Sequence, residues 1–137
     1  LLYMTRAVAP LMREQKKGHI INIGSTAGKV VYQNGNVYCA TKFAVDALSQ
    51  ATRIDLLPYH IKVTSINPGM AETEFSLVRF KGDTEKAKKV YEGFESLSGA
   101  DIADTVYYCA TLAPHVCIND LTITCTYQAN SVYKVKE

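Results

Sequence analysis

The stretch HIINIGSTAG, residues 19 to 28, decides the fold of this 137-residue chain. Ile20, Ile21 and Ile23 form a short β-branched apolar run, and small residues end it at once. A run of this kind is typical of a strand buried on both faces, as in a parallel sheet. The glycines and hydroxyl residues that follow predict a loop that a ligand can approach closely at the carboxyl end of the strand.

Helices and strands alternate along the rest of the chain. The predicted order is a helix over residues 1–15, the strand just described, a helix over 37–57, a strand over 61–69, a short helix over 85–91, a helix over 98–114 and a strand over 118–126. Ser98 and Asp101 form a capping-box pattern at the start of the last helix. Such alternation implies right-handed crossovers and a parallel sheet, so the fold class is α/β. The residues after Tyr127 show no pattern that predicts structure.

The first helix carries apolar residues at spacings of three and four, namely Leu1, Met4, Val8, Leu11 and Met12. This spacing predicts that one face of the helix is buried. No capping residue precedes it, and position 1 is not methionine. We therefore expect a chain that begins inside a helix, with further residues upstream.

Composition excludes several classes of protein. A net charge of +2, with 20% charged and 47% hydrophobic residues, argues against a nucleic-acid or anionic-membrane partner. No apolar run approaches the ~20 residues of a membrane span. The four cysteines form no CxxC pair and no secretory signal is present, which predicts reduced thiols in a cytoplasmic protein. The three histidines show no metal-ligand spacing, so no metal is expected.

The stretch NVYCATK, residues 36 to 42, places Tyr38 four positions before Lys42 in the second helix. Residues at this spacing share a helix face. A phenol has a pKa near ~10, and a nearby ammonium favours the phenolate. The pair could therefore exchange a proton with an alcohol or a carbonyl while a hydride moves to or from a nicotinamide cofactor. The alternative is a solvated surface pair, which is the usual meaning of an isolated Y-x-x-x-K.

Two further features surround this pair. Ser25 follows the apolar strand and lies 13 residues before Tyr38, and Pro68-Gly69 ends the next strand. A serine after a middle strand, a Y-x-x-x-K 13 residues later and a P-G after the next strand together resemble the short-chain dehydrogenase/reductase family. The resemblance covers nearly all of the chain and implies a Rossmann-type, doubly wound parallel sheet that binds NAD or NADP.

The resemblance also implies a role for each matching residue. Ser25 would polarise the oxygen of the substrate, and Tyr38 would act as the acid and base. Lys42 would lower the pKa of the tyrosine and bind the nicotinamide ribose. Four positions after the second strand would line or reach the nicotinamide: Pro68, Gly69, Ala71 and Thr73.

Two segments, TEFSLVRFKGD (73–83) and PHVCINDL (114–121), are similar to one branch of the family. That branch includes NADP-dependent 3-hydroxy acid and serine dehydrogenases, which implies NADP, with NAD as the alternative, and a small hydroxy acid as substrate. The carboxylate of such a substrate calls for a cation, and Arg79 is the candidate. The alternative is that Arg79 is a solvated surface residue.

The family's glycine-rich turn for the cofactor diphosphate has no counterpart, because no G-x-x-x-G-x-G occurs before Ser25. Residues 1–137 are therefore expected to be the carboxyl-terminal, catalytic and substrate-side part of a single Rossmann-type domain, with the cofactor-binding amino-terminal half absent. The sheet would keep three strands, and the first would have an unpaired edge. We expect this chain alone to be inactive and the intact protein to be active.

Two functions of different class are left open. The first is an oxidoreductase that transfers a hydride between NADP(H) and a secondary alcohol or carbonyl. The second is a non-catalytic fragment that keeps only the fold and an oligomer interface. A sugar-nucleotide epimerase is disfavoured, because the segment after Gly69 is too short for a sugar-binding domain. The resemblance further implies a homodimer or homotetramer, since helices like the first two pair between subunits in this family.

Overall fold

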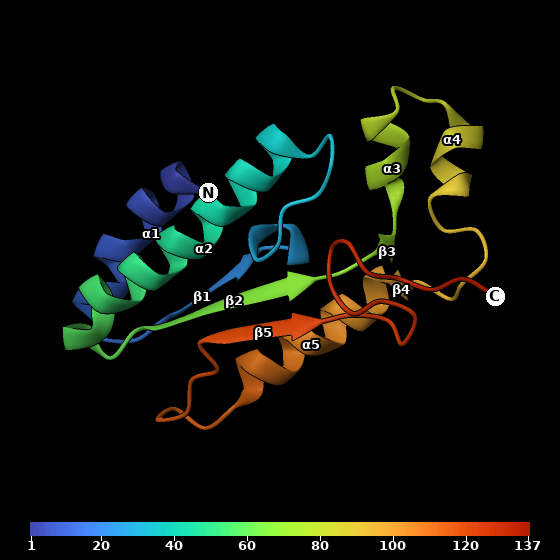
Figure 1. Ribbon diagram of the computed structural model, residues 1–137. Helices are drawn as coiled ribbons and strands as arrows, with labels where there is room; N and C mark the ends of the chain where they lie inside the picture. The colour runs from blue at the N-terminus through green and yellow to red at the C-terminus, as the bar shows by residue number, and fades with distance from the viewer.

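The computed structural model describes residues 1–137, and three parallel strands form its main sheet (Figure 1). The strands are β1 (His19–Ile23), β2 (Lys62–Pro68) and β5 (Asp120–Ile123), in the spatial order β1-β2-β5. Ile20 pairs with Val63, and Ser65 pairs with Asp120. The predicted parallel sheet is therefore confirmed, and β5 is shorter than the predicted strand.

Helices cover both faces of this sheet, as expected for a doubly wound fold. Figure 1 shows α1 (Leu2–Gln15) and α2 (Asn36–Leu56) on one face and α5 (Gly99–Thr111) on the other. The strand between them, β2, is the most buried element, with every residue from Val63 to Pro68 buried. Because the three strands are parallel, the carboxyl ends of β1, β2 and β5 lie at the same edge of the sheet.

The capping box predicted at the start of α5 is present. The Asp101 backbone N–H donates to Ser98 Oγ at 3.3 Å, and the Ser98 backbone N–H donates to Asp101 Oδ2 at 2.7 Å. The helix ends at Thr111, before the predicted limit at Pro114. An α conformation is disfavoured immediately before a proline, so the chain leaves the helix early.

Small elements fill the segment between β2 and α5. They are β3 (Ala71–Glu72), α3 (Glu74–Arg79), α4 (Thr84–Lys89) and β4 (Leu97–Ser98), and β3 pairs with β4 in parallel. Of these, the sequence predicts only α4. Hydroxyl or carboxylate caps start both helices, since Thr73 Oγ1 accepts from the Phe75 N–H and Asp83 Oδ1 accepts from the Lys86 N–H.

The predicted buried face of α1 is wrong for three of its five residues. Leu1, Met4 and Leu11 are 47%, 67% and 58% exposed, whereas Val8 and Met12 are partly buried. Ala9 and Met12 of the helix pack against the core cluster of Leu56, Ile61 and Val63. Periodicity identified an apolar face, but it could not show how much of that face this chain covers.

β1 is an edge strand, with β2 as its only neighbour in the sheet. Two one-turn helices flank α2 in the chain. η1 (Thr26–Gly28) lies between β1 and α2, and η2 (Leu57–Tyr59) lies between α2 and β2. No helix in the structure combines the length and the apolar character that a membrane crossing requires.

Candidate active site

Ser25 lies directly after β1, where the chain turns into η1. Its Oγ accepts a hydrogen bond from the Ala27 backbone N–H at 3.1 Å, so the side chain caps this short helix and is held in place. The preceding Gly24 lies against β2, because a Cβ there would stand 2.1 Å from Asn67 Oδ1. Local turn chemistry therefore fixes a buried serine hydroxyl at the carboxyl edge of the sheet.

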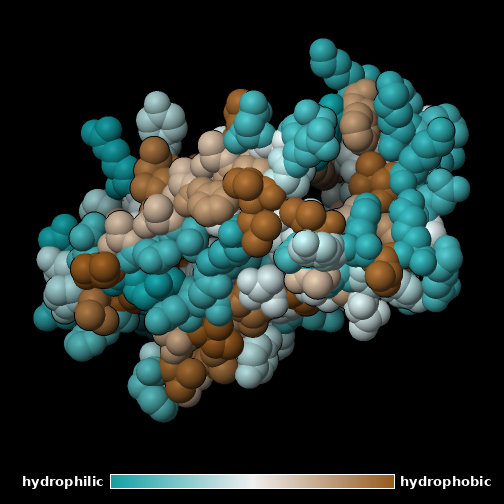
Figure 2. Space-filling model, in the orientation of Figure 1, coloured by the Kyte–Doolittle hydropathy of each residue, from teal (hydrophilic) through white to brown (hydrophobic).

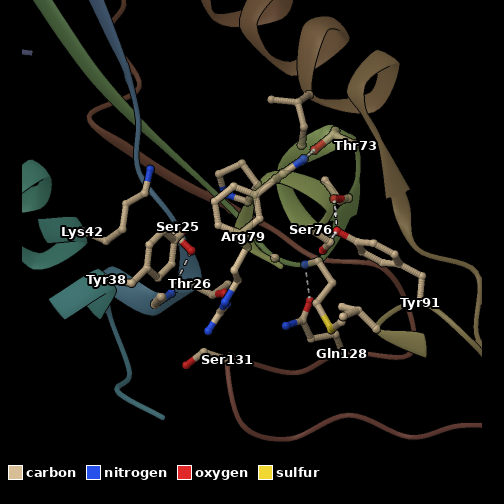
Figure 3. A pocket seen from close by; sticks show the side chains of 18 of the residues that line it. Ser25, Thr26, Tyr38, Lys42, Thr73, Ser76, Arg79, Tyr91, Gln128 and Ser131 are labelled. Carbon is tan, nitrogen blue, oxygen red and sulfur yellow. Dashed lines mark hydrogen bonds between the residues drawn. The ribbon is translucent and has the colours of Figure 1, made fainter. Parts of the chain in front are cut away.

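Tyr38 and Lys42 lie one turn apart on α2; the Tyr38 ring lies beside Ser25, and the Lys42 side chain points toward the end of β1 (Figure 3). The Lys42 ammonium donates to the Ile23 carbonyl at 3.1 Å and lies 5.8 Å from the centre of the Tyr38 ring. Close packing of η1 on α2 depends on Gly28, since a Cβ there would stand 2.6 Å from the Lys42 carbonyl oxygen. Lys42 is therefore anchored to the end of β1, and both residues of the pair are partly buried.

Burial is the largest influence on the titration of this pair. It raises the pKa of the Tyr38 phenol above its usual value, while the neighbouring Ser25 hydroxyl and the Arg79 guanidinium act in the opposite direction. Burial also lowers the pKa of the Lys42 ammonium. The lowering of the tyrosine pKa that the resemblance attributes to Lys42 therefore stays a prediction.

The loop after β2 forms the next wall of the site. The Gly69 backbone N–H donates to the Ile123 carbonyl at 2.7 Å, which ties the loop to the end of β5. Gly69 also allows close approach from the carboxyl-terminal segment, because a Cβ there would stand 2.2 Å from Gln128 Oε1. Beyond it, Thr73 is the N-cap of α3.

α3 brings the Phe75 ring against Tyr38 and the Arg79 guanidinium over the ring of Tyr32. The ring centres of Phe75 and Tyr38 are 5.5 Å apart. Arg79 Nη1 donates to the Tyr32 hydroxyl at 3.2 Å, and its guanidinium lies 5.8 Å from the Tyr32 ring centre. The contact with Tyr32 positions the guanidinium, and Figure 3 shows Arg79 on the same side of the cavity as Tyr38.

These residues line one cavity of about 570 Å³. Figure 2 shows the surface hollowed beside α3. All eight residues singled out in the sequence lie on its wall: Ser25, Tyr38, Lys42, Pro68, Gly69, Ala71, Thr73 and Arg79. The wall also contains no aspartate or glutamate. The structure thus brings the candidate set together, while the role of each member stays a prediction.

The sequence did not identify several residues of this wall. Gln128, Ser131 and Lys134 come from the carboxyl-terminal segment that showed no usable pattern, and Tyr91 comes from the segment after α4. The Tyr91 hydroxyl donates to the Ala71 carbonyl at 3.0 Å. Their contacts join segments that are far apart in the chain, so no local sequence pattern predicts them.

Comparisons with known proteins show the family of the chain. The family model described as "short chain dehydrogenase" matches residues 1–83. An NADP-dependent 3-hydroxy acid dehydrogenase of Salmonella typhi, YdfG, is 50% identical over 138 residues, which cover 98% of this chain and 56% of that protein. An NADP-dependent 3-hydroxy acid dehydrogenase of Schizosaccharomyces pombe is 40% identical, with 98% and 52% covered.

A solved structure extends the likeness to three dimensions. The closed form of a serine dehydrogenase complexed with NADP+ has a TM-score of 0.93 and 47% identity, covering 99% of this chain and 55% of that one. The chain thus spans about half the length of the curated relatives it matches. The match over residues 1–83, the doubly wound parallel sheet and the Ser25–Tyr38–Lys42 arrangement lead to one conclusion: the chain belongs to the short-chain dehydrogenase family.

Proposed function

We propose that the protein is an NADP-dependent oxidoreductase that interconverts the hydroxyl and carbonyl forms of a small hydroxy acid. The observation that carries the proposal is the meeting of Ser25, Tyr38 and Lys42 on one cavity wall at the carboxyl ends of the parallel strands. The names of the relatives support the cofactor and the substrate class.

The chemistry of the cavity wall fits the nicotinamide half of the cofactor. Ile23, Pro68 and Met70 offer apolar surface for a planar ring, and Lys42 and Thr73 offer polar groups for the ribose and the carboxamide or phosphate. When bound, NADP(H) supplies or accepts the hydride at the substrate carbon. The chain contains no G-x-x-x-G-x-G turn for the diphosphate, so residues 1–137 correspond to the catalytic, substrate-side part of the domain.

Tyr38 transfers the proton. In reduction, the phenol gives its proton to the substrate oxygen as the carbonyl becomes an alcohol; in oxidation, the phenolate takes the hydroxyl proton. The Ser25 hydroxyl donates a hydrogen bond to the same oxygen and stabilises its developing charge. Lys42 places a positive charge beside the phenol and favours its ionised form.

Arg79 provides a partner for the substrate carboxylate. Its guanidinium forms no salt bridge with any acidic residue, so its charge is free to pair with an anion in the cavity. The bond to the Tyr32 hydroxyl orients the guanidinium but does not neutralise it. A planar guanidinium can bind a carboxylate through two parallel hydrogen bonds.

The subunits are proposed to associate as a homodimer or homotetramer. Tyr3, Met4 and Leu11 of α1 and Ile54 of α2 are exposed apolar side chains. Figure 2 shows apolar atoms over this side of the molecule. A second copy would cover such a surface.

The test uses the complete product of the gene that encodes this chain. We expect it to reduce NADP+ with 3-hydroxybutanoate and to oxidise NADPH with the corresponding keto acid, and to do so faster with NADP(H) than with NAD(H). Absence of both turnover and NADP+ binding in a folded sample would contradict the proposal and would favour a non-catalytic protein that keeps only the fold.

A further inference from the structure

The last residues of the chain form a small hairpin, which we call the carboxyl-terminal hairpin (residues 127–135). Gln128 and Lys134 form an antiparallel bridge. The Ala129 N–H donates to the Tyr133 carbonyl at 3.0 Å, and the Val135 N–H donates to the Tyr127 carbonyl at 2.9 Å. These bonds flank the bridge, so Gln128 and Lys134 are directly opposed and their side chains lie on the same face of the hairpin.

Asn130 sets the turn of this hairpin. Its Oδ1 accepts the backbone N–H groups of Val132 and Tyr133 at 2.8 and 2.9 Å. An asparagine side chain that bonds its own backbone two residues on is a common turn device. The hairpin therefore has a defined geometry of its own.

Two side chains of the hairpin bind backbone groups on two different sides of the cavity. Gln128 is only 6% exposed; its Oε1 accepts the Met70 backbone N–H at 2.7 Å, and its Nε2 donates to the Asn130 carbonyl at 2.9 Å. On the other side, Ser131 Oγ donates to the Val30 carbonyl. The hairpin is thus attached both to the loop after β2 and to the segment after η1, and it forms a wall of the cavity (Figure 3).

Lys134 is the cation on this wall. Its Nζ lies 3.6 Å from Met70 Sδ and 5.4 Å from the centre of the Phe94 ring, and no carboxylate lies within salt-bridge distance. Partial burial, and then the charge of Lys136, lower the pKa of the Lys134 ammonium. The contacts with a thioether and a ring position the ammonium without neutralising it.

Some lysines of the chain form salt bridges with carboxylates. Lys29 bonds Asp46 at 2.8 Å and Asp120 at 2.7 Å, and Lys86 bonds Asp83 at 3.1 Å. Lys134, in contrast, lines a cavity that also holds Lys42 and Arg79 and has no acidic residue on its wall. Three cations around one acid-free cavity favour an anionic occupant.

Each of the other two cations donates a hydrogen bond to a neutral oxygen of the protein, whereas the only hydrogen-bond contact of Lys134 is the weak one with the Met70 thioether. Lys42 donates to the Ile23 carbonyl beneath the Tyr38 ring, and Arg79 donates to the Tyr32 hydroxyl. We propose that Lys134, held opposite Gln128 on the carboxyl-terminal hairpin, is a second residue that binds the substrate carboxylate and so determines specificity for acids over neutral alcohols. This inference rests on the proposed function and adds a specificity residue to it.

The test compares Lys134→Met with Lys136→Met in the complete gene product. Methionine keeps the length and the apolar contacts of the lysine stem. Lys136 is exposed, as Lys134 is, and lies two residues away, but it does not line the cavity. The substrates are 3-hydroxybutanoate and the neutral butan-2-ol. We expect Lys134→Met to raise KM for 3-hydroxybutanoate about tenfold, the cost of one charge-assisted hydrogen bond, with kcat little changed. Its kcat/KM for butan-2-ol and its KM for NADP+ should match the wild type, and Lys134→Arg should restore the KM for the acid.

A binding measurement separates this inference from the proposed function. Calorimetric titration with 3-hydroxybutanoate should show the same tenfold loss of affinity in Lys134→Met whether or not turnover occurs, so an inactive protein would refute the function alone. Unchanged affinity and KM for the acid in Lys134→Met would overturn the inference. So would an equal loss of kcat/KM for butan-2-ol, which would indicate packing, or a selective change in NADP+ affinity, which would indicate a cofactor contact.

Discussion

Two regions line the same cavity and are held in different ways. Ser25, Tyr38 and Lys42 stand on regular elements, where β1, η1 and α2 pack against one another. The carboxyl-terminal hairpin joins the same cavity through side chains, mainly the amide of Gln128 on the Met70 backbone. The first region should therefore carry the chemistry and keep its geometry under mutation, while the second should tune binding and depend on single residues.

A large effect is expected from Lys42→Ala, in the region proposed to carry the chemistry. In the proposed mechanism, loss of the ammonium removes both the charge that favours the Tyr38 phenolate and the partner of the nicotinamide ribose. We expect kcat for alcohol oxidation to fall about a hundredfold and KM for NADP+ to rise. Steady-state kinetics on the complete gene product measure both. A loss of thermal stability with wild-type kinetics would show instead that Lys42 serves only its bond to the Ile23 carbonyl.

A smaller effect is expected from Gln128→Leu, in the hairpin. The change leaves the Met70 N–H without its partner in a part-buried position, which costs about 1–3 kcal/mol of folding free energy. Because the hairpin supplies Lys134, KM for the acid substrate should rise several-fold while kcat changes little. Gln15→Leu, at an exposed position on α1, is the matched control for both thermal melting and kinetics. A fall in kcat as large as that of Lys42→Ala would remove the distinction between the two regions.

The smallest expected difference between the two regions is in the pH dependence of turnover. Burial raises the pKa of Tyr38, so the phenol stays protonated at neutral pH. The reduction rate should therefore fall as pH rises through this pKa, and the oxidation rate should rise over the same interval. Lys42→Ala should move both transitions to higher pH, whereas Gln128→Leu should leave them where they are. Coincident profiles for the wild type and Lys42→Ala would show that the lysine does not influence the tyrosine.

The fold was predictable because its elements follow local rules. A β-branched run predicted β1, and the Ser98–Asp101 capping box predicted the start of α5. The strand-end residues could be found as well, because parallel strands bring their carboxyl ends to one edge. Ser25 and the loop at Gly69 meet there for that reason.

The remaining elements and contacts could not be predicted from the sequence, and the physical reason differs for each. α3 has only six residues, too few to show a helical period, and β3 and β4 have two each. Gln128 acts on Met70, 58 residues away, and nothing near it in the chain marks that contact. The apolar residues of α1 identified one face of the helix, but they did not predict that much of this face is exposed. Exposure depends on what packs against the helix.

The most direct test of the account is a single-turnover measurement of NADPH oxidation by the complete gene product and its Tyr38→Phe variant. Phenylalanine keeps the ring contact with Phe75 and removes only the hydroxyl that we propose exchanges the proton. With the keto acid of 3-hydroxybutanoate, hydride transfer should slow by about 10²–10⁴-fold in the variant, while NADPH affinity and thermal melting match the wild type. Hydride transfer at the wild-type rate in Tyr38→Phe would contradict the assignment of Tyr38 as the acid and base.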